Sequence, residues 1–403
     1  MPDNPPLRRN FPFQMLWIGG AVSSLGSAVT GLALPLLLIT ITGSSAFAGA
    51  VAFAGLAAGT LISVPAGVWV DRHPLKKVML ASLTVQMVCW GSVTVAILLG
   101  SVTLVHVFAA AIIGSLADAF FEPAQQVAIR QVVPAVQLPS AYAQDEARSH
   151  AANLGGPPLG GVLFTVGRAV PFLVDTISFL AAMVCLALVR LPHRAPRPAA
   201  ERPSMRQEAG EALRWLWGHR GIRAALGLGL MANLTVNAMM LPLMIRAGDP
   251  VASGVVIGSL GVGGLLGALI APRVTRLAPA GMLFVYVLTL FALCMPASAL
   301  PFGSYWPVVP MVVAMLAVPA LNVALKTILA TLVPGDMMGR VGALMQAASM
   351  ALVPFSPLVG GVLAQVLGGS RAMVVLGVVL LLTCAFAVSS GDLRKLAVPT
   401  TAG

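Results

Sequence analysis

A short basic turn joins two long apolar segments of this chain. The turn reads Gly67-Val68-Trp69-Val70-Asp71-Arg72-His73-Pro74-Leu75-Lys76-Lys77. Residues 45–69, which lead into it, and residues 78–99, which follow it, have almost entirely apolar side chains and only a few uncharged polar ones. A helix needs about 20 such residues to cross the hydrocarbon core of a bilayer. The turn is therefore predicted to lie at a membrane surface, between two spanning helices.

The whole chain has the composition of these two segments. Of its 403 residues 58% are hydrophobic and 9% are charged, whereas about a quarter of the residues of a soluble domain are charged. At about 30 residues per span and loop, this length predicts about twelve spans. We place them at residues 13–40, 45–69, 78–99, 104–129, 141–166, 169–189, 222–245, 251–271, 280–300, 306–332, 340–366 and 372–389.

One connection is long and divides the chain. Residues 190–221 are rich in Arg and Pro, and an amphipathic helix is predicted near their end, at 205–217. We therefore expect an N-terminal six-helix half (residues 1–189), a cytoplasmic linker with an amphipathic helix (190–221) and a C-terminal six-helix half (222–403). The predicted class is an all-α membrane protein of twelve transmembrane helices in two pseudo-symmetric halves.

Basic residues predict the orientation. With the N-terminus inside, 21 of the 24 Lys and Arg residues fall on the cytoplasmic side, and the other three are Arg168, Arg246 and Arg371. This bias follows the positive-inside rule and accounts for the net charge of +11 without a nucleic-acid partner. The first apolar segment is too long for a signal-peptide core. We expect a multi-pass protein of the cytoplasmic membrane with both termini in the cytoplasm.

The two halves repeat. When the sequence is shifted by 200 residues, Val133-Pro134 coincides with Val333-Pro334, and the run from Pro157 to Leu163 coincides with the run from Pro357 to Leu363. Matched Pro and Gly positions fix backbone shape, so they carry more weight than matched Ala. Parallel six-helix repeats are typical of one large class of secondary transporter.

Several other classes are excluded. No GxxxxGK[ST] phosphate loop occurs, so ATP is not expected to drive the protein. No HExxH occurs and the five histidines are scattered, which argues against a membrane enzyme. The four cysteines lie inside apolar spans and form no CxxC. We expect no cofactor and no bound metal, and an ion gradient as the energy source.

The turn at residues 67–77 resembles the signature loop of the major facilitator superfamily, G-x-x-x-D-R-x-x-R-K-K, with Leu75 where the family often has a base. The resemblance implies that this segment forms a cytoplasmic gate. Gly67 would let two helices approach closely, and Asp71 would accept hydrogen bonds from a helix that begins near Arg340. The basic residues of the motif are Arg72, Lys76 and Lys77. The alternative is a positive-inside loop with one stray acid.

The predicted fifth span contains Gly156-Pro157-Pro158-Leu159-Gly160-Gly161. It resembles the G-P-x-x-G-G signature of major-facilitator antiporters, which are exporters. Gly156 and Gly160 form a small-residue face, and Pro157 removes a backbone donor and bends the helix. Gly161 completes the motif. The alternative is helix packing of a kind found in any transporter.

Acidic side chains inside the membrane are the candidates for proton coupling. Asp118 and Glu122 lie four residues apart in one span and so share a helix face. A charged side chain at mid-membrane costs about 2.5–3.5 kcal/mol, so a functional reason is expected. The alternative is that Arg130 or backbone groups satisfy them. Asp175 is a third candidate, for which a capping or interface role is equally open. Asp145, Glu146 and Arg148 are expected to form local pairs.

Polar residues in other predicted cavity-lining spans are further candidates. We hypothesise that Lys326 pairs with Glu122 across the cytoplasmic mouth, with snorkelling of Lys326 to the cytoplasm as the alternative. The remaining cavity candidates are Ser27, Thr30, Asn233, Asn237, Met240 and Asn322. The methionines near residue 240 would give an adaptable apolar wall, although core packing is the commoner role.

Three blocks are also similar to the macrolide-efflux branch of bacterial drug:proton antiporters, which contains siderophore exporters. They are residues 67–79, 120–134 and 339–361. The resemblance implies a monomeric secondary transporter that exports a drug-like or antibiotic-like small molecule by proton antiport and alternating access. A siderophore or specialised-metabolite exporter is the alternative. A proton-coupled uptake permease and a non-transporting sensor are less favoured.

Overall fold

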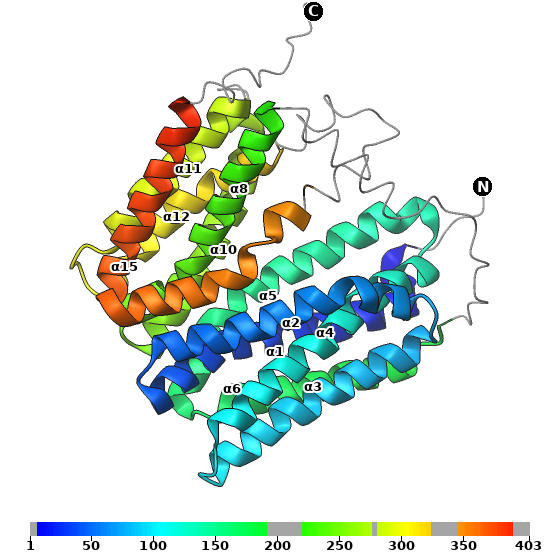
Figure 1. Ribbon diagram of the computed structural model, residues 1–403. Helices are drawn as coiled ribbons and strands as arrows, with labels where there is room; N and C mark the ends of the chain where they lie inside the picture. Colours follow the sequence, from blue (N-terminus) through cyan, green and yellow to red (C-terminus); the bar gives the residue numbers. More distant parts are fainter. Residues whose placement is uncertain (1–5, 192–219, 276–279, 324–344, 346, 390–403) are drawn as a thin grey trace, which may run out of the picture. The chain divides into compact units, whose positions relative to one another are not determined.

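The computed structural model describes residues 6–191, 220–275, 280–323, 345 and 347–389. Within these ranges all regular secondary structure is helical (Figure 1). Eight of the described helices are long and apolar enough to cross a membrane, and Val285–Ser298 and Val308–Val323 are shorter apolar helices. The predicted all-α membrane class is confirmed. The total of twelve spans stays a prediction, because parts of the predicted spans at 306–332 and 340–366 lie outside the described residues.

The chain forms two compact units. One contains Met1–Arg197 and Pro250–Gly258, and the other contains Pro198–Asp249 and Ser259–Gly403. The predicted boundaries at residues 189 and 222 remain predictions. Most of the predicted linker, including its amphipathic helix, lies outside the described residues.

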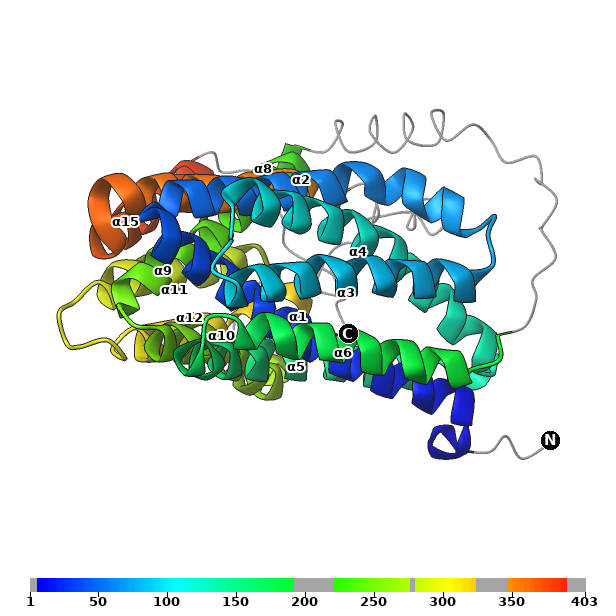
Figure 2. The same ribbon diagram turned by 90° about the horizontal axis from the view of Figure 1, so that it is seen from below.

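Six long helices make up most of the first unit. They are α1 (Phe11–Thr42), α2 (Ser45–Val70), α3 (Leu75–Leu98), α4 (Leu104–Val132), α5 (Leu138–Val166) and α6 (Val170–Leu188), with the short 3-10 helices η1 (Leu7–Arg9) and η2 (Ala135–Gln137). Each long helix lies within a few residues of a predicted span. Figure 2 shows α2, α4, α3 and α6 lying next to one another in that order.

Local chemistry sets the helix ends. The side chains of Asn10, Ser44 and Thr103 each accept a hydrogen bond from the backbone N–H three residues on, at 3.2, 3.1 and 3.3 Å. Such N-caps satisfy donors that have no partner inside the helix. Gly43 ends α1 with φ of 66° and Gly100 follows α3 with φ of 65°, in the left-handed region that glycine adopts without strain.

The core of the first unit lies where α1 meets α5 and α6, and where α3 meets α4 and α6. Phe172 and Phe179 of α6 are almost completely buried there. A second apolar cluster closes the end of the unit near the N-terminus, with Leu7, Phe13, Ile129, Val133 and Ala141 as its buried members. It fastens η1 and the start of α1 to the end of α4 and the start of α5.

The described helices of the second unit begin with α8 (Arg220–Ala238) and α9 (Met240–Ala247). A single helix over 222–245 is predicted from the sequence, but the structure breaks it at Met239. Pro242 explains the break, because it has no N–H for the Ala238 carbonyl and its ring crowds that oxygen. A Cβ on Gly360 would overlap the same carbonyl, so another helix packs directly against the break.

Further helices of this unit are α11 (Ala280–Ser298), α12 (Val308–Leu316) and α15 (Ser356–Ser389), with the 3-10 helix η3 at Val353–Phe355; α10 (Pro250–Val274) starts in the first unit. α15 packs against α8, α9 and α11. Gly368, with φ of 77°, separates the two predicted spans that α15 contains. η3 interrupts the predicted span at 340–366, where Pro354 removes a helical donor.

Candidate functional site

A pocket of about 560 Å³ lies between α2 and α4. Two glycines of α2, Gly55 and Gly59, let the helices approach at one end of it, since a Cβ on Gly55 would lie 3.0 Å from Ser115 Oγ. Such close contact through small residues is typical of membrane helices. The pocket is lined by Gly55, Leu56, Gly59, Thr60 and Ser63 of α2 and by Ser115, Asp118, Ala119, Glu122, Pro123 and Gln126 of α4.

Asp118 and Glu122 are the charged members of this pocket. Both side chains are exposed to it, and they stand one helical turn apart on the same face of α4, as their spacing predicts. No lysine or arginine is among the pocket-lining residues that the structure describes. Two negative charges one helical turn apart repel each other, so the pair favours a bound cation or proton. The pocket therefore has the chemistry of a cation or proton site.

The rest of the lining mostly accepts hydrogen bonds. Pro123 has no N–H, so the carbonyl of Ala119, four residues earlier, lacks its helical donor. Thr60, Ser63 and Ser115 add hydroxyl groups. Leu56 and the glycines of α2 give an apolar side. In the described part of the chain no group of three or more His, Cys, Asp or Glu residues is arranged to hold a metal ion.

Asp175 occupies a different environment. It is 0% exposed in α6, at the contact with α1 rather than in the pocket. Its Oδ1 accepts a hydrogen bond of 3.2 Å from Ser178 Oγ, and a Cβ on Gly26 would lie 2.6 Å from the same oxygen. The side chain of Thr30 on α1 is also buried and lies close enough to Asp175 to interact with it. Thr30 is thus part of this helix contact, whereas Ser27 is exposed.

The predicted local pairing at the start of α5 is confirmed for Asp145 and Arg148, and that pair is buried, whereas Glu146 pairs with His150 instead. Arg148 pairs with Asp145 at 2.9 Å, with side chains 8% and 12% exposed, and it donates from Nη1 to Ser24 Oγ at 2.7 Å. His150 and Glu146 form an exposed pair. Sequence reasoning missed that Arg148 fastens α5 to α1. The one weak signal in the sequence is Gly20 of α1, a position that must be small because a Cβ there would collide with this guanidinium.

The signature loop has a contact that its motif does not suggest. Lys76 donates to the carbonyls of Ala187 and Val189 at 2.7 and 2.8 Å, so it caps the C-terminus of α6, where a cation is favoured. Asp71, Arg72 and Lys77 are exposed. A Cβ on Gly67 would meet none of the described atoms within 4 Å. The implied partner segment near Arg340 lies outside the described residues, so the gate stays a prediction.

The glycines of the fifth-span motif make close helix contacts. A Cβ on Gly156 would overlap Ala28 of α1, and one on Gly160 would lie 2.8 Å from the Val29 carbonyl. Gly161 faces Pro250, which belongs to the same unit. α5 remains one helix through Pro157. The motif therefore joins α5 closely to its neighbours.

Two of the predicted cavity residues in the second unit, Asn233 and Asn237, donate hydrogen bonds to backbone carbonyls. Asn233 Nδ2 donates to the Ser349 carbonyl at 3.2 Å, just before the interruption at η3, and Asn237 Nδ2 donates to the Asn233 carbonyl at 2.8 Å. Met240 starts α9 and is half-buried, and Asn322 is exposed. Lys326, the hypothesised partner of Glu122, lies outside the described residues. Asn233 thus supports an interrupted helix.

Comparisons with known proteins agree with the fold and the motifs. Residues 4–398 match the major-facilitator family described as "Transmembrane secretion effector". The chain is 25% identical to the multidrug efflux pump Tap of Mycolicibacterium fortuitum, over 96% of this chain and 97% of the relative. It is 24% identical to macrolide efflux protein A of Streptococcus pyogenes, over 62% of this chain and 66% of the relative.

Solved transporter structures share the fold. A bacterial homologue of the iron transporter ferroportin, in an inward-facing state, matches with a TM-score of 0.73 and 16% identity, over 96% of this chain and 99% of the other. A bacterial homologue of the human lysosomal transporter Spinster, inward-facing and unoccupied, matches with a TM-score of 0.72 and 15% identity, over 99% and 100%. At these identities the likeness establishes the fold.

Proposed function

This chain belongs to the transmembrane secretion effector family of the major facilitator superfamily, and from that premise we propose that it exports drug-like small molecules across the cytoplasmic membrane. Two relatives named as efflux pumps support the direction and the substrate class, and one of them aligns over nearly the whole chain. The family membership makes the protein a transporter rather than an enzyme.

The pocket between α2 and α4 is the observation that supports proton coupling. Its two carboxylates face open space without a basic neighbour among the described lining residues. Ionised, the pair would bind a cationic or hydrogen-bond-donating substrate, and protonated, it would release that substrate. Because the two states exclude each other at one site, substrate would leave as a proton enters. This exchange is antiport.

The chemistry of the pocket lining limits the class of substrate that can bind. Leu56 and the glycines of α2 offer an apolar wall, while the acids, the hydroxyl groups and the Ala119 carbonyl offer acceptors. An amphipathic organic molecule with an amine or several donors fits this combination. A small anion does not, because it would meet two carboxylates.

The unit of transport is the single chain with both termini in the cytoplasm. The distribution of Lys and Arg supports that orientation. The internal repeat supports two six-helix halves, residues 1–189 and 222–403, joined by the linker at 190–221. On this basis alternating access moves one half against the other, and the segment from Gly67 to Lys77 gates the cytoplasmic side.

Accumulation of a fluorescent cationic dye and of a radiolabelled macrolide in drug-sensitive cells tests the function. Cells that express the protein should accumulate less of at least one compound, and a protonophore should abolish the difference. The variant that carries both Asp118→Asn and Glu122→Gln should accumulate as much as cells without the protein. Equal accumulation by wild-type and empty cells, with the protein shown in the membrane, would count against drug export.

A further inference from the structure

Gln126 lines the acidic pocket between α2 and α4 but has no part in the proton exchange proposed for that pocket. It stands on α4 one helical turn after Glu122, on the face that Asp118 and Glu122 share. Its carboxamide is half-buried, and no hydrogen bond joins it to another residue that the structure describes. An amide that is withdrawn from water without a partner costs free energy, so a ligand that pairs with it gains affinity.

Most other polar groups of the pocket accept hydrogen bonds. Ser63 Oγ donates its one proton to the Thr60 carbonyl at 2.8 Å, so its lone pairs are what it offers to a ligand. The ionised carboxylates have no proton to donate. The Ala119 carbonyl lacks its helical donor because of Pro123. A carboxamide, in contrast, has two N–H donors, and Gln126 is the member of the described lining that brings a side-chain N–H to the pocket.

The hydroxyl groups of Thr60 and Ser115 are the other donors of the described lining. Each has one proton, and both face a pocket that contains two carboxylates. Hydrogen bonds to an ionised acceptor are about twice as strong as those between neutral groups, so these protons are drawn to the acids. The Gln126 amide has a second N–H to spare for a neutral acceptor.

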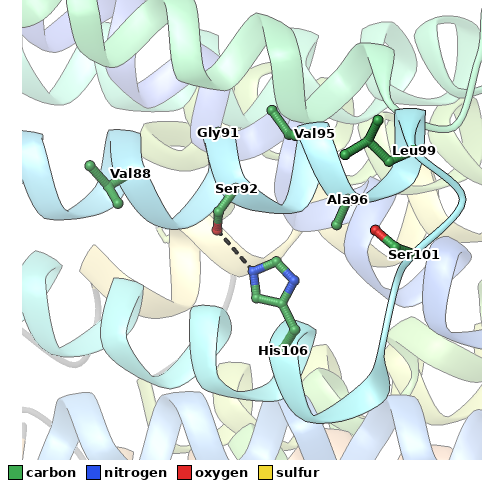
Figure 3. Close-up of a pocket in the computed structure, with 8 residues that line it drawn as sticks. All are labelled: Val88, Gly91, Ser92, Val95, Ala96, Leu99, Ser101 and His106. Atoms are coloured by element: carbon green, nitrogen blue, oxygen red, sulfur yellow. Dashed lines mark hydrogen bonds between the residues drawn. The ribbon is translucent and has the colours of Figure 1, made fainter.

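A second cavity shows the opposite arrangement. It is a groove between α3 and α4 that shares no residue with the acidic pocket (Figure 3). Ser92 and His106 lie in its middle, with Ser92 Oγ 2.9 Å from His106 Nε2 and donating to the Cys89 carbonyl at 2.7 Å. No asparagine or glutamine is among the groove-lining residues described. The unpaired amide is therefore a property of the acidic pocket.

We propose that Gln126 makes the pocket selective for amines that also carry an acceptor oxygen, such as a ketone or ester carbonyl. The amine donates to Asp118 or Glu122, and Gln126 Nε2 donates to the carbonyl oxygen. Glu122 and Gln126 are four residues apart, which is about 6 Å of helix, so the oxygen should lie about that far from the nitrogen. This inference rests on the proposed function, because it requires that the acids bind an amine.

A matched pair of ligands tests the selectivity. One is a tertiary amine with an aryl ketone about four bonds from the nitrogen, and the other has a methylene group in place of the carbonyl. Binding of each to the purified full-length protein is measured by isothermal titration calorimetry. Wild type should bind the ketone about fivefold more tightly, the factor expected of one neutral hydrogen bond.

Three variants locate the recognition. Gln126→Leu and Gln126→Met both remove the N–H groups, and Met also keeps the length of the side chain. In each of them the ratio of the two affinities should be about one. Gln131→Leu is the matched control, because Gln131 is also half-buried on α4 but does not line the pocket. Gel filtration shows that each variant is folded.

A preference for the ketone in wild type and Gln131→Leu that disappears in both Gln126 variants supports the assignment. Equal binding of the two amines by wild type overturns the selectivity but leaves amine export standing. A preference that persists without the Gln126 amide gives the recognition to another group and also overturns the assignment. If folded wild type binds neither amine, the amine class proposed for the pocket fails, and the selectivity fails with it.

Discussion

The first unit contains two acidic sites in opposite environments. Asp118 and Glu122 stand in an open pocket between α2 and α4, whereas Asp175 is enclosed where α6 meets α1 under Gly26. A carboxylate that must exchange a proton or a ligand needs a path for it, and the pocket provides one. A carboxyl group with no exposed surface is part of the packing. Accessibility thus decides between the two roles, proton coupling and helix contact, that the sequence leaves open for Asp175.

The largest difference between the two sites should be in transport. Replacing both pocket acids, by Asp118→Asn and Glu122→Gln, removes the charge that binds a cationic substrate. A hydrogen bond to a charged group is worth about 1.5–3 kcal/mol, so the initial efflux rate at low substrate should fall about tenfold or more. Dye efflux from preloaded cells measures it. A double variant that transports at the wild-type rate would contradict the role given to the pocket.

Chemical labelling should separate the same sites by access. A hydrophobic carbodiimide reacts with protonated carboxyl groups that it can reach. We expect peptide mass spectrometry to find the label on Asp118 or Glu122 and not on Asp175. Substrate added first should protect the pocket acids. Labelling of Asp175 in folded protein would show that the α1–α6 contact opens and that Asp175 is as accessible as the pocket acids.

Stability should depend on the enclosed site. In Gly26→Ala the new methyl group would overlap Ser178 Oγ and press on Asp175 Oδ1, and such overpacking costs about 1–3 kcal/mol. A lower melting temperature in detergent should report it. Gly31→Ala is the matched control, since a Cβ at Gly31 of the same helix meets no described atom within 4 Å. Equal melting temperatures for the two variants would show that the close contact at Gly26 does not contribute to stability.

The smallest effect should come from Asp175→Asn. The amide is nearly isosteric with the carboxyl group and can donate toward Thr30, so the free energy of unfolding should change by less than about 1 kcal/mol. Dye efflux should stay within a factor of about two of wild type, because an enclosed side chain whose replacement changes the fold so little contacts neither the substrate nor the pocket. Loss of efflux with normal folding would make Asp175 a coupling residue and reverse the assignment.

Much of the fold could be predicted from short-range chemistry. Asn10, Ser44 and Thr103 each start a helix where the sequence predicts a span, because N-capping depends on only a few neighbouring residues. Proline was less informative. Pro242 is preceded by a real break at Met239, yet α5 continues through Pro157. Whether a proline breaks a helix depends on packing by neighbours such as Gly360, which lies more than 100 residues away.

The candidate site could be predicted in part. The i, i+4 spacing placed Asp118 and Glu122 on one face of α4, but the sequence does not say that Thr60 and Ser63 of α2 lie opposite. The same limit applies to Arg148, whose partner Ser24 comes from another helix. It applies to Lys76 as well, which caps α6 rather than only carrying a loop charge. Tertiary contacts decide these roles, and no local pattern encodes them.

Proton movement in inverted membrane vesicles shows whether the pocket acids couple substrate export to proton entry. Respiration acidifies the vesicle lumen, and a transported substrate is then added. We expect substrate-evoked proton release from the lumen by wild type and by Asp175→Asn, and none by the variant with both Asp118→Asn and Glu122→Gln. Proton release that persists in the double variant, or that only Asp175→Asn abolishes, would contradict it.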